Sequence, residues 1–361
     1  MTVHPEAFHD AEVDLEESGV QVRGRVFPAI IGTVLLAILF AALLIEAPFR
    51  RDLRIGKAVE ARGGHISRVF VGPDWIAPYV RNRLPVLNRI NTISLFHQET
   101  PPEVLMELGA LPYLDQLDLT DVQISDSGLR QLSELQRLSV LRLDSTLVTD
   151  AGLGHLSDLR RLERLDLYGT NVSDDGLVHL KKLQALKTLS LKYTQVTDDG
   201  LPILQSLPNL RALFLGGTGI TDTGLKHLGA MRDLEQLDLN NTEISDAGVE
   251  QLAGLGRLKV LSLSLTQTTG RGLQAVAGMV SLEELALSYD EIGNEGLKYL
   301  APLPNLRILR LDNTDVTDRG LRHLADLPNL KWLYLNGTQV TAAGREQLRQ
   351  LLPACNIVPI P

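Results

Sequence analysis

The sequence predicts an α/β solenoid, a curved stack of short coils with a concave parallel sheet and convex short helices, after one N-terminal transmembrane helix. Two observations predict this fold class. An L-x-L unit recurs every 24 residues, and a run of 20 residues without a charge, 26–45, precedes the repeats. A fixed period of this length indicates stacked repeats, and about 20 apolar residues suffice to cross a bilayer.

The composition fits one large elongated domain rather than a disordered chain. The 361 residues are 44% hydrophobic and 4% aromatic, and 35 basic against 44 acidic side chains give a net charge of -9. An acidic chain without a basic run is a poor partner for phosphates, so we expect no nucleic acid partner. The one cysteine, Cys355, excludes an intrachain disulfide and any site built on a pair of cysteines.

The N-terminal segments are predicted from charge. Residues 1–25 carry two bases and six acids, which predicts an acidic disordered tail. Residues 26–45, at about 1.5 Å per residue, would span roughly 30 Å as a transmembrane helix. A cleaved secretory signal and a buried core helix remain alternatives. The length of the apolar run and its acidic leader favour an uncleaved signal anchor.

The side of the membrane stays open. Arg23 and Arg25 precede the span, whereas five bases follow it closely, namely Arg50, Arg51, Arg54, Lys57 and Arg62. The positive-inside rule therefore weakly favours a cytoplasmic location for the C-terminal part, although long domains often cross regardless of flanking charge. We expect 46–65 to be a juxtamembrane connecting segment, with Phe49, Leu53, Ile55 and Val59 on its apolar side, and 66–92 to be an N-terminal cap.

Residues 93–361 are predicted to be repeats that end in a C-terminal cap. The opening leucines are Leu117, Leu141, Leu165, Leu189, Leu213, Leu237, Leu261, Leu285, Leu309 and Leu333. The register continues back to Ile93, more faintly to Val69 and Val71, and forward to Ile357. In each unit the L-x-L alternation predicts a strand with inward leucines. A Ser or Thr before Asp then predicts the cap of a short helix, and the acid in the first turn suits the dipole of that helix.

A glycine recurs eleven residues after each opening leucine. These are Gly128, Gly152, Gly176, Gly200, Gly224, Gly248, Gly272, Gly296, Gly320 and Gly344. Glycine costs about 1 kcal/mol in a helix relative to alanine, so ten of them predict a steric need, namely close packing between neighbouring coils. Strands stack at about 4.8 Å whereas helices need about 8–10 Å, so the stack must curve with its strands inside.

The pattern T-x-V-T-D-x-G-L-x-x-L resembles the leucine-rich repeat family, in the variant of many bacterial membrane-anchored repeat proteins. The resemblance covers about residues 90–361 and implies a horseshoe that binds other molecules. Where the family often has Asn or Cys, this chain has threonines, whose hydroxyls can still bond to neighbouring backbone. They are Thr146, Thr170, Thr194, Thr218, Thr242, Thr266, Thr314 and Thr338.

A search for catalytic motifs finds no constellation of acids, bases or nucleophiles, so we expect no enzyme, no cofactor, no metal and no small-molecule substrate. His155, His179, His227 and His323 share one repeat position and are explained as solvated helix residues. One coil is irregular, since Gly270 replaces the usual Asp and Asp290 replaces the ladder threonine of the next coil. Local drift and a functional notch explain this equally well.

A protein partner is expected on the concave strand positions, where Tyr, Trp and Arg side chains of the kind that dominate interfaces occur. The candidate binding residues are Arg164, Asp166, Tyr168, Ser190, Lys192, Tyr193, Phe214, Arg310, Asp312, Trp332 and Tyr334. The sequence thus predicts a non-catalytic, single-pass, membrane-anchored protein-binding scaffold or receptor-like module. The alternatives are a structural cell-envelope or spacer protein and, more remotely, an unrecognised enzyme.

Overall fold

The computed structural model describes residues 46–72, 85–97 and 102–358. The chain divides into two units, Met1–Arg51 and Asp52–Pro361. The described residues of the first unit, 46–51, are helical. The predicted tail (1–25) and transmembrane helix (26–45) lie outside the described residues. Within the described part of the chain, no helix combines the length and the apolar character that crossing a bilayer requires.

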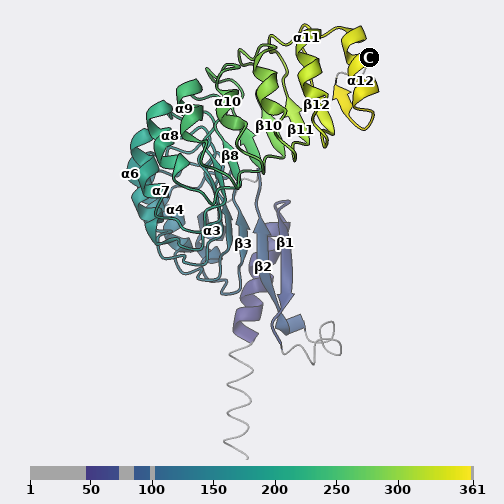
Figure 1. Cartoon of the computed structure of the whole chain (residues 1–361). Helices are drawn as coiled ribbons and strands as arrows, with labels where there is room; N and C mark the ends of the chain where they lie inside the picture. The colour runs from purple at the N-terminus through teal and green to yellow at the C-terminus, as the bar shows by residue number, and fades with distance from the viewer. Residues whose placement is uncertain (1–45, 73–84, 98–101, 359–361) are drawn as a thin grey trace, which may run out of the picture. The chain divides into compact units, whose positions relative to one another are not determined.

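The second unit is a stack of coils whose strands form one 13-stranded sheet in sequence order (Figure 1). β1 is antiparallel to β2, and β2 to β13 run parallel. The strands are β1 (His65–Phe70), β2 (Asn88–Ser94), β3 (Gln116–Asp118), β4 (Val140–Arg142), β5 (Arg164–Asp166), β6 (Thr188–Ser190), β7 (Ala212–Phe214), β8 (Gln236–Asp238), β9 (Val260–Ser262), β10 (Glu284–Ala286), β11 (Ile308–Arg310), β12 (Trp332–Tyr334) and β13 (Asn356–Val358).

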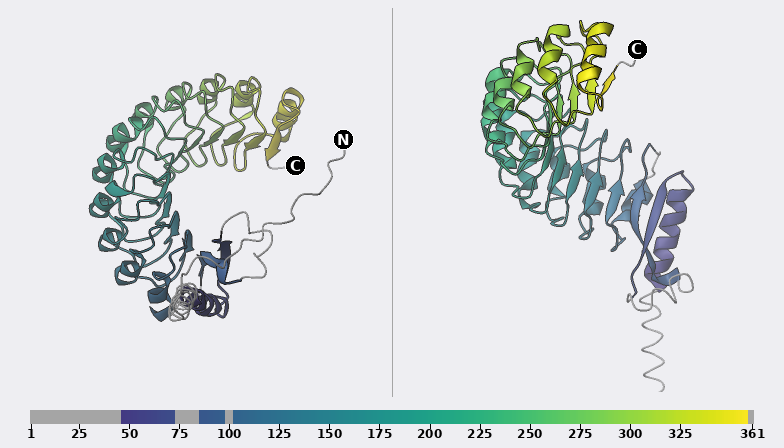
Figure 2. Two further views of the ribbon diagram at one scale, coloured as in Figure 1. Left: turned by 90° about the horizontal axis from the view of Figure 1, so that it is seen from below. Right: turned by 45° about the vertical axis from the view of Figure 1, so that its right-hand side comes forward.

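Short helices form the outer side of the coils, while the strands line the inner side of the arc (Figure 2). The α-helices are α3 (Pro102–Leu108), α4 (Asp126–Leu129), α5 (Asp150–Gly154), α6 (Asp174–Leu177), α7 (Leu201–Leu204), α8 (Asp222–Gly229), α9 (Asp246–Gln251), α10 (Leu273–Val276), α11 (Asp318–Leu321) and α12 (Ala342–Leu351). The 3-10 helices are η2 (Pro85–Leu87), η3 (Arg130–Leu132), η4 (Val178–Lys182), η5 (Asp198–Gly200), η6 (Gly296–Leu300) and η7 (Arg322–Leu324).

The predicted 24-residue register is confirmed by the strand pairing. Leu165 pairs with Leu141 on one side and Leu189 on the other. The register extends as predicted to Ile93, which pairs with Leu117, and to Ile357, which pairs with Leu333. The inward leucines are almost completely buried along the stack. Burying one such side chain contributes about 1.5–3 kcal/mol, which no isolated coil could obtain.

The fainter extension of the register to Val69 is wrong. Val69 lies in β1, pairs with Arg89 in an antiparallel arrangement and is 42% exposed. β1 and β2 therefore form an antiparallel pair at the start of the sheet, not a further coil. A hydrophobic alternation alone cannot distinguish the two arrangements, because both place alternate residues on the same face.

The helical residues 52–60 are held against this strand pair by a buried ion pair. Arg89 Nε donates to Asp52 Oδ2 at 2.7 Å, and the backbone N-H of Ile90 donates to the same oxygen at 3.2 Å. Ile55 and Val59 are buried as predicted, whereas Leu53 is 36% exposed. The buried carboxylate thus receives donors from both side chain and backbone, as a desolvated charge requires.

The coils are joined on their helical side by a repeated aspartate contact. The first helical Asp of one coil accepts the backbone N-H of the Ser or Thr 23 residues later and also its hydroxyl group. For Asp222 and Ser245 these distances are 2.8 and 2.5 Å. The same pair recurs from Asp126, Asp150, Asp174, Asp198, Asp246 and Asp318. The acid predicted to serve its own helix dipole therefore also stabilises the next coil.

Seven of the ten recurring glycines are explained by these aspartates, because a β-carbon at each would meet the Asp Oδ1 of the preceding coil. A β-carbon at Gly248 would lie 2.2 Å from Asp222 Oδ1, and one at Gly176 would lie 2.3 Å from Asp150 Oδ1. Real atoms do not approach so closely, so only glycine leaves room for the carboxylate of the preceding coil. The predicted steric need between coils is confirmed at these seven glycines, where the close neighbour is a side chain, whereas Gly296 lies against the backbone of Gly270.

Most of the ladder threonines act within their own coil, whereas Thr266 bonds to Asp290 of the next coil. Thr146, Thr170, Thr194, Thr242, Thr314 and Thr338 each donate to the carbonyl oxygen three residues earlier, at 2.6–2.8 Å. The predicted bonding of these hydroxyls to backbone is therefore confirmed for the local turn. The remaining side-chain bonds between coils come from other residues, among them the first-turn aspartates.

Not every junction has the aspartate. Asn294 takes its place at one junction and accepts the backbone N-H of Thr317 at 2.9 Å, whereas another junction has neither residue of the contact. Gly270 replaces the Asp and Gly293 replaces the Ser or Thr that would receive it. The two coils meet instead through Asp290, whose Oδ1 accepts the backbone N-H of Thr266 at 2.7 Å. Asp290 is 4% exposed and its Oδ2 is buried without a partner. Burial raises the pKa of this carboxyl group to about 7, so the irregular coil carries a titratable contact.

Replacing Gly248 with alanine should destabilise the protein by about 1–3 kcal/mol or more, because the β-carbon must displace the Asp222 carboxylate. The matched control is Gly256→Ala, since a β-carbon at Gly256 meets nothing within 4 Å. This control should stay within about 1 kcal/mol of the parent. Urea unfolding measures both, and equal midpoints for the two variants would contradict the contact.

Asp290 should make stability depend on pH. Its folded pKa of about 7 lies above its ordinary value of 3.8, so stability should fall as the pH rises from about 4 to about 7. At 1.36 kcal/mol per unit, this shift costs at most roughly 4 kcal/mol at alkaline pH. Asp290→Asn keeps an acceptor without the charge and should flatten the profile. Thermal melts at pH 5 and pH 8 compare the variants, and identical profiles would refute the effect.

Candidate functional site

A hollow of about 510 Å³ lies on the concave face, over β4 to β7. It is lined by Thr120, Arg142, Asp144, Ser145, Arg164, Asp166, Tyr168, Ser190, Lys192 and Phe214. Apart from Arg164, which precedes the first inward leucine of its coil, these residues sit at the outward strand position between two inward leucines or in the turn that follows. Six of them are predicted binding residues, namely Arg164, Asp166, Tyr168, Ser190, Lys192 and Phe214. The structure therefore brings most of the first predicted cluster into one hollow.

The remaining residue of that cluster, Tyr193, lies beside the hollow. Its ring packs edge-on against Tyr168 with the ring centroids 5.2 Å apart. Tyr193 is 50% exposed and has a φ of 54°, in the left-handed region that favours glycine. A β-carbon at Gly217, the equivalent residue of the next coil, would lie 2.5 Å from the Tyr193 ring. Gly217 therefore leaves the space in which this ring lies.

Charged groups inside the hollow form a network centred on Asp166. Arg164 Nε lies 2.8 Å and Arg142 Nε 3.4 Å from Asp166 Oδ2. Lys192 is paired with Asp238 at 2.7 Å. Asp144 accepts the backbone N-H of Tyr168 at 2.8 Å. Burial, together with the nearby carboxylates of Asp166 and Asp118, raises the pKa of Asp144.

The second predicted cluster lies near the C-terminal end of the sheet. The rings of Trp332 and Tyr334 are stacked with centroids 6.4 Å apart, and the Arg310 guanidinium lies 4.5 Å from the centre of the Tyr334 ring. Arg310 also pairs with Glu284 at 3.2 Å. Asp312 accepts the backbone N-H of Asn336 at 2.9 Å. These residues form a flat aromatic and charged surface rather than a continuation of the first hollow, which ends at Phe214.

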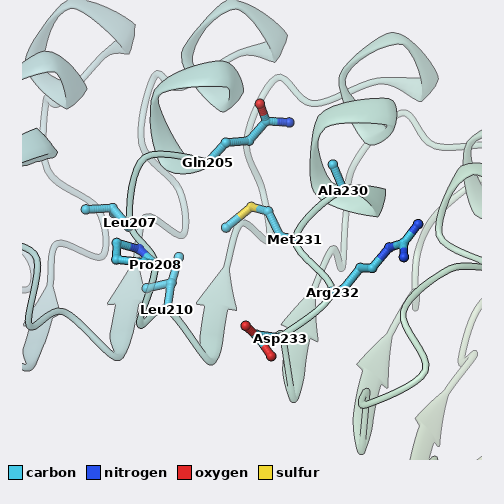
Figure 3. A pocket seen from close by; sticks show the side chains of 8 residues that line it. All are labelled: Gln205, Leu207, Pro208, Leu210, Ala230, Met231, Arg232 and Asp233. Atoms are coloured by element: carbon cyan, nitrogen blue, oxygen red, sulfur yellow. The ribbon is translucent and has the colours of Figure 1, made fainter.

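Another hollow, of about 370 Å³, lies between two consecutive coils where α7 and α8 end (Figure 3). Its lining includes the buried Leu207 and Leu210 and the partly buried Met231. Met231 occupies a repeat position that is leucine in the preceding coil, and its side chain extends toward that coil (Figure 3). This hollow therefore follows from a change of core side chain.

The sequence did not single out Arg142, Asp144, Leu265 or Tyr289. Arg142 and Asp144 line the first hollow, one coil before the predicted cluster. Leu265 and Tyr289 occupy the left-handed turn position with φ of 60° and 66°, and they are 51% and 59% exposed. The 24-residue register could have revealed the left-handed turn at Leu265 and Tyr289, because the same repeat position holds glycine at Gly169, Gly217 and Gly337.

No set of three or more His, Cys, Asp and Glu side chains is placed to hold a metal ion within the parts of the chain that the structure describes. The buried Cys355 is a free thiol whose pKa is raised to about 11 by burial. The candidate site is thus a surface of charged and aromatic side chains on a rigid sheet.

Comparison with known proteins agrees with this architecture. The leucine-rich repeat family matches residues 206–229, 230–253 and 279–301. No curated protein matches the chain. Given these matches and the sheet described above, the chain carries leucine-rich repeats, as its sequence predicted.

Solved structures share the fold at low sequence identity. An internalin from Listeria monocytogenes is 20% identical, over 79% of this chain and 93% of its own, with a TM-score of 0.52. A chain of the mouse RP105/MD-1 complex is also 20% identical, over 68% of this chain and 42% of its own, with a TM-score of 0.53. At this identity the likeness shows the fold alone.

Tyr289→Asn should stabilise the protein by about 0.5–1 kcal/mol. Asparagine adopts the left-handed conformation more readily than tyrosine, and the exposed Tyr289 ring contributes little packing. Asn241→Tyr, the reverse exchange at φ 54°, is the matched control and should destabilise by a similar amount. Chemical unfolding of both variants measures the difference. A stability loss in Tyr289→Asn would show that the tyrosine is held by contacts that outweigh the backbone strain.

Proposed function

We propose that this protein is a non-catalytic, membrane-anchored scaffold that binds another protein through the concave hollow around Tyr168 and Phe214. The observation that carries the proposal is the gathering of Arg164, Tyr168, Lys192 and Phe214 over one hollow of a rigid sheet. Aromatic and arginine side chains contribute most to protein interfaces. A rigid sheet also loses little entropy when a partner binds.

The leucine-rich repeat scaffold supports the general part of this proposal, namely that the protein binds another protein. Such repeats present an extended concave surface while their leucines and caps supply the stability. One of the similar folds comes from the structure of a protein complex, RP105/MD-1. The scaffold is unspecific for the partner, so the partner's chemistry has to be inferred from the side chains in the hollow.

The attachment to the membrane is the second part of the proposal. It rests on the 20 uncharged residues 26–45, which are long enough for a single span. The five bases that follow, against two that precede, favour a cytoplasmic repeat domain. In this arrangement the concave surface would recruit an intracellular protein to the membrane.

The binding proposal is tested by placing a photo-crosslinking amino acid at position 168 or 178 of the full-length protein in its host cells. Tyr168 lies on the concave side and Val178 in η4 on the helical side, with exposures of 41% and 44%. We expect a discrete crosslinked product from position 168 and none from position 178. Phe214→Ala should lower the yield at position 168 at least threefold, whereas Val178→Ala should not. Equal patterns from both positions would favour a structural spacer.

The anchoring proposal is tested by protease treatment of intact and permeabilised cells that carry a C-terminal tag on the protein. We expect the protein to resist alkaline extraction from membranes, and its tag to be cut only after permeabilisation. Deleting residues 26–45 should release it into the soluble fraction. Cleavage of the tag in intact cells would overturn the cytoplasmic assignment, and extraction of the full-length chain would overturn the anchor.

A further inference from the structure

One residue that lines the hollow carries a hydrogen-bond acceptor that the protein itself does not satisfy. Asp166 is 3% exposed and lines the hollow. Its Oδ2 receives Arg164 and Arg142, but its Oδ1 is buried and has no hydrogen-bond partner. Buried polar atoms are almost always paired in folded proteins, because an unmade hydrogen bond lowers stability. An unpaired carboxylate oxygen at a binding surface therefore points to a donor supplied by the ligand.

The charges around this oxygen favour a cationic donor. Three carboxylates gather here, those of Asp118, Asp144 and Asp166. Two guanidinium groups, those of Arg142 and Arg164, face these carboxylates. They form ion pairs with Asp118 and Asp166. Lys192 is already paired with Asp238. The raised pKa of Asp144, caused by burial and then by the two neighbouring carboxylates, agrees with one negative charge that is not compensated.

The shape and the walls of the hollow favour a long side chain with a charged end. Tyr168 and Phe214 supply aromatic surface, and the volume of about 510 Å³ exceeds that of one side chain. A lysine stem of four methylene groups packs on aromatic rings, and its compact ammonium group offers three donors. Arg142 and Arg164 are each 43% exposed, so they can move into solvent when a cation enters.

We propose that the concave hollow receives a lysine side chain of the bound protein, whose ammonium group donates to Asp166 Oδ1 and lies beside Asp144. This inference rests on the proposed protein-binding function and names the chemistry of the partner at that same site. Asp166 is the recognition residue, while Tyr168 and Phe214 contact the aliphatic stem. The carboxylates of Asp144 and Asp118 repel a partner that presents a carboxylate in place of the ammonium group.

The test uses full-length protein in detergent and two acetylated, amidated peptides, Gly-Lys-Gly and its norleucine counterpart. Norleucine has nearly the same length but carries no charge. Ligand-observed saturation-transfer NMR should show binding of the lysine peptide with an affinity at least tenfold higher than that of the norleucine peptide. Equal affinities would overturn the proposal, and tighter binding of an arginine peptide would overturn the assignment to lysine.

Two substitutions assign the binding to the hollow. Asp166→Asn preserves size and should lower the affinity for the lysine peptide at least tenfold. Asp144→Asn should lower it several-fold and gives an independent reading if Asp166→Asn does not fold. Asp315→Asn is the control, because Asp315 is an exposed aspartate in the turn after β11, outside the hollow and outside both predicted clusters. It should leave the affinity within twofold, and unchanged binding in both hollow variants would overturn the proposal.

The result is distinguishable from a failure of the proposed function. If position 168 forms a crosslink with a partner but the lysine peptide does not bind, only the lysine assignment fails. If position 168 forms no crosslink, the protein-binding function fails, whatever the peptide result. When both hold, Asp166→Asn should also reduce the crosslinked product in cells at least threefold.

Discussion

The contact between an aspartate of one coil and the glycine and hydroxyl residue of the next holds the helical side of this protein in register. Asp222, for example, accepts the N-H and hydroxyl groups of Ser245 and lies against Gly248. Each coil thereby receives a fixed position relative to its neighbour, independent of the leucine core. Leucines provide most of the burial energy, but apolar packing is not directional and would tolerate sliding. Directional hydrogen bonds remove that freedom.

The strand register follows from this constraint. With the helical side fixed, Leu141, Leu165 and Leu189 pair directly with one another across the sheet, and outward side chains of successive coils lie in straight rows. The hollow exists because such rows bring Arg142, Asp166, Ser190 and Phe214 side by side. At the junction where Gly270 and Gly293 replace the residues of this contact, Asp290 supplies a different bond between the same two coils. The stack continues through the irregularity because some directional contact is kept at each step.

The sequence predicted the period, the curved α/β solenoid and most of the first concave cluster. Periodicity determines which residue faces inward, so the outward position between two leucines could be assigned without coordinates. The sequence could not predict which group each polar side chain forms a hydrogen bond with. The acid in each first turn was predicted to act only on the dipole of its own helix, because the residue to which it is hydrogen-bonded lies 23 positions away. Arg142 and Asp144 were missed because clusters were chosen by aromatic content, whereas the hollow is bounded by charge.

In this fold, the residues that stabilise the stack are different from the residues that lie on the concave surface. The inward leucines pack against one another, and the ladder threonines and first-turn aspartates are hydrogen-bonded within the stack. The ten-residue α12 covers its last coil. The outward strand positions are therefore left free to vary, and here they hold residues that the fold does not need. Tyr193 in a left-handed turn and Asp166 with an unpaired buried oxygen both lower stability where they stand. Their position at one hollow, while most other buried polar groups are satisfied, is what a surface shaped for a ligand requires.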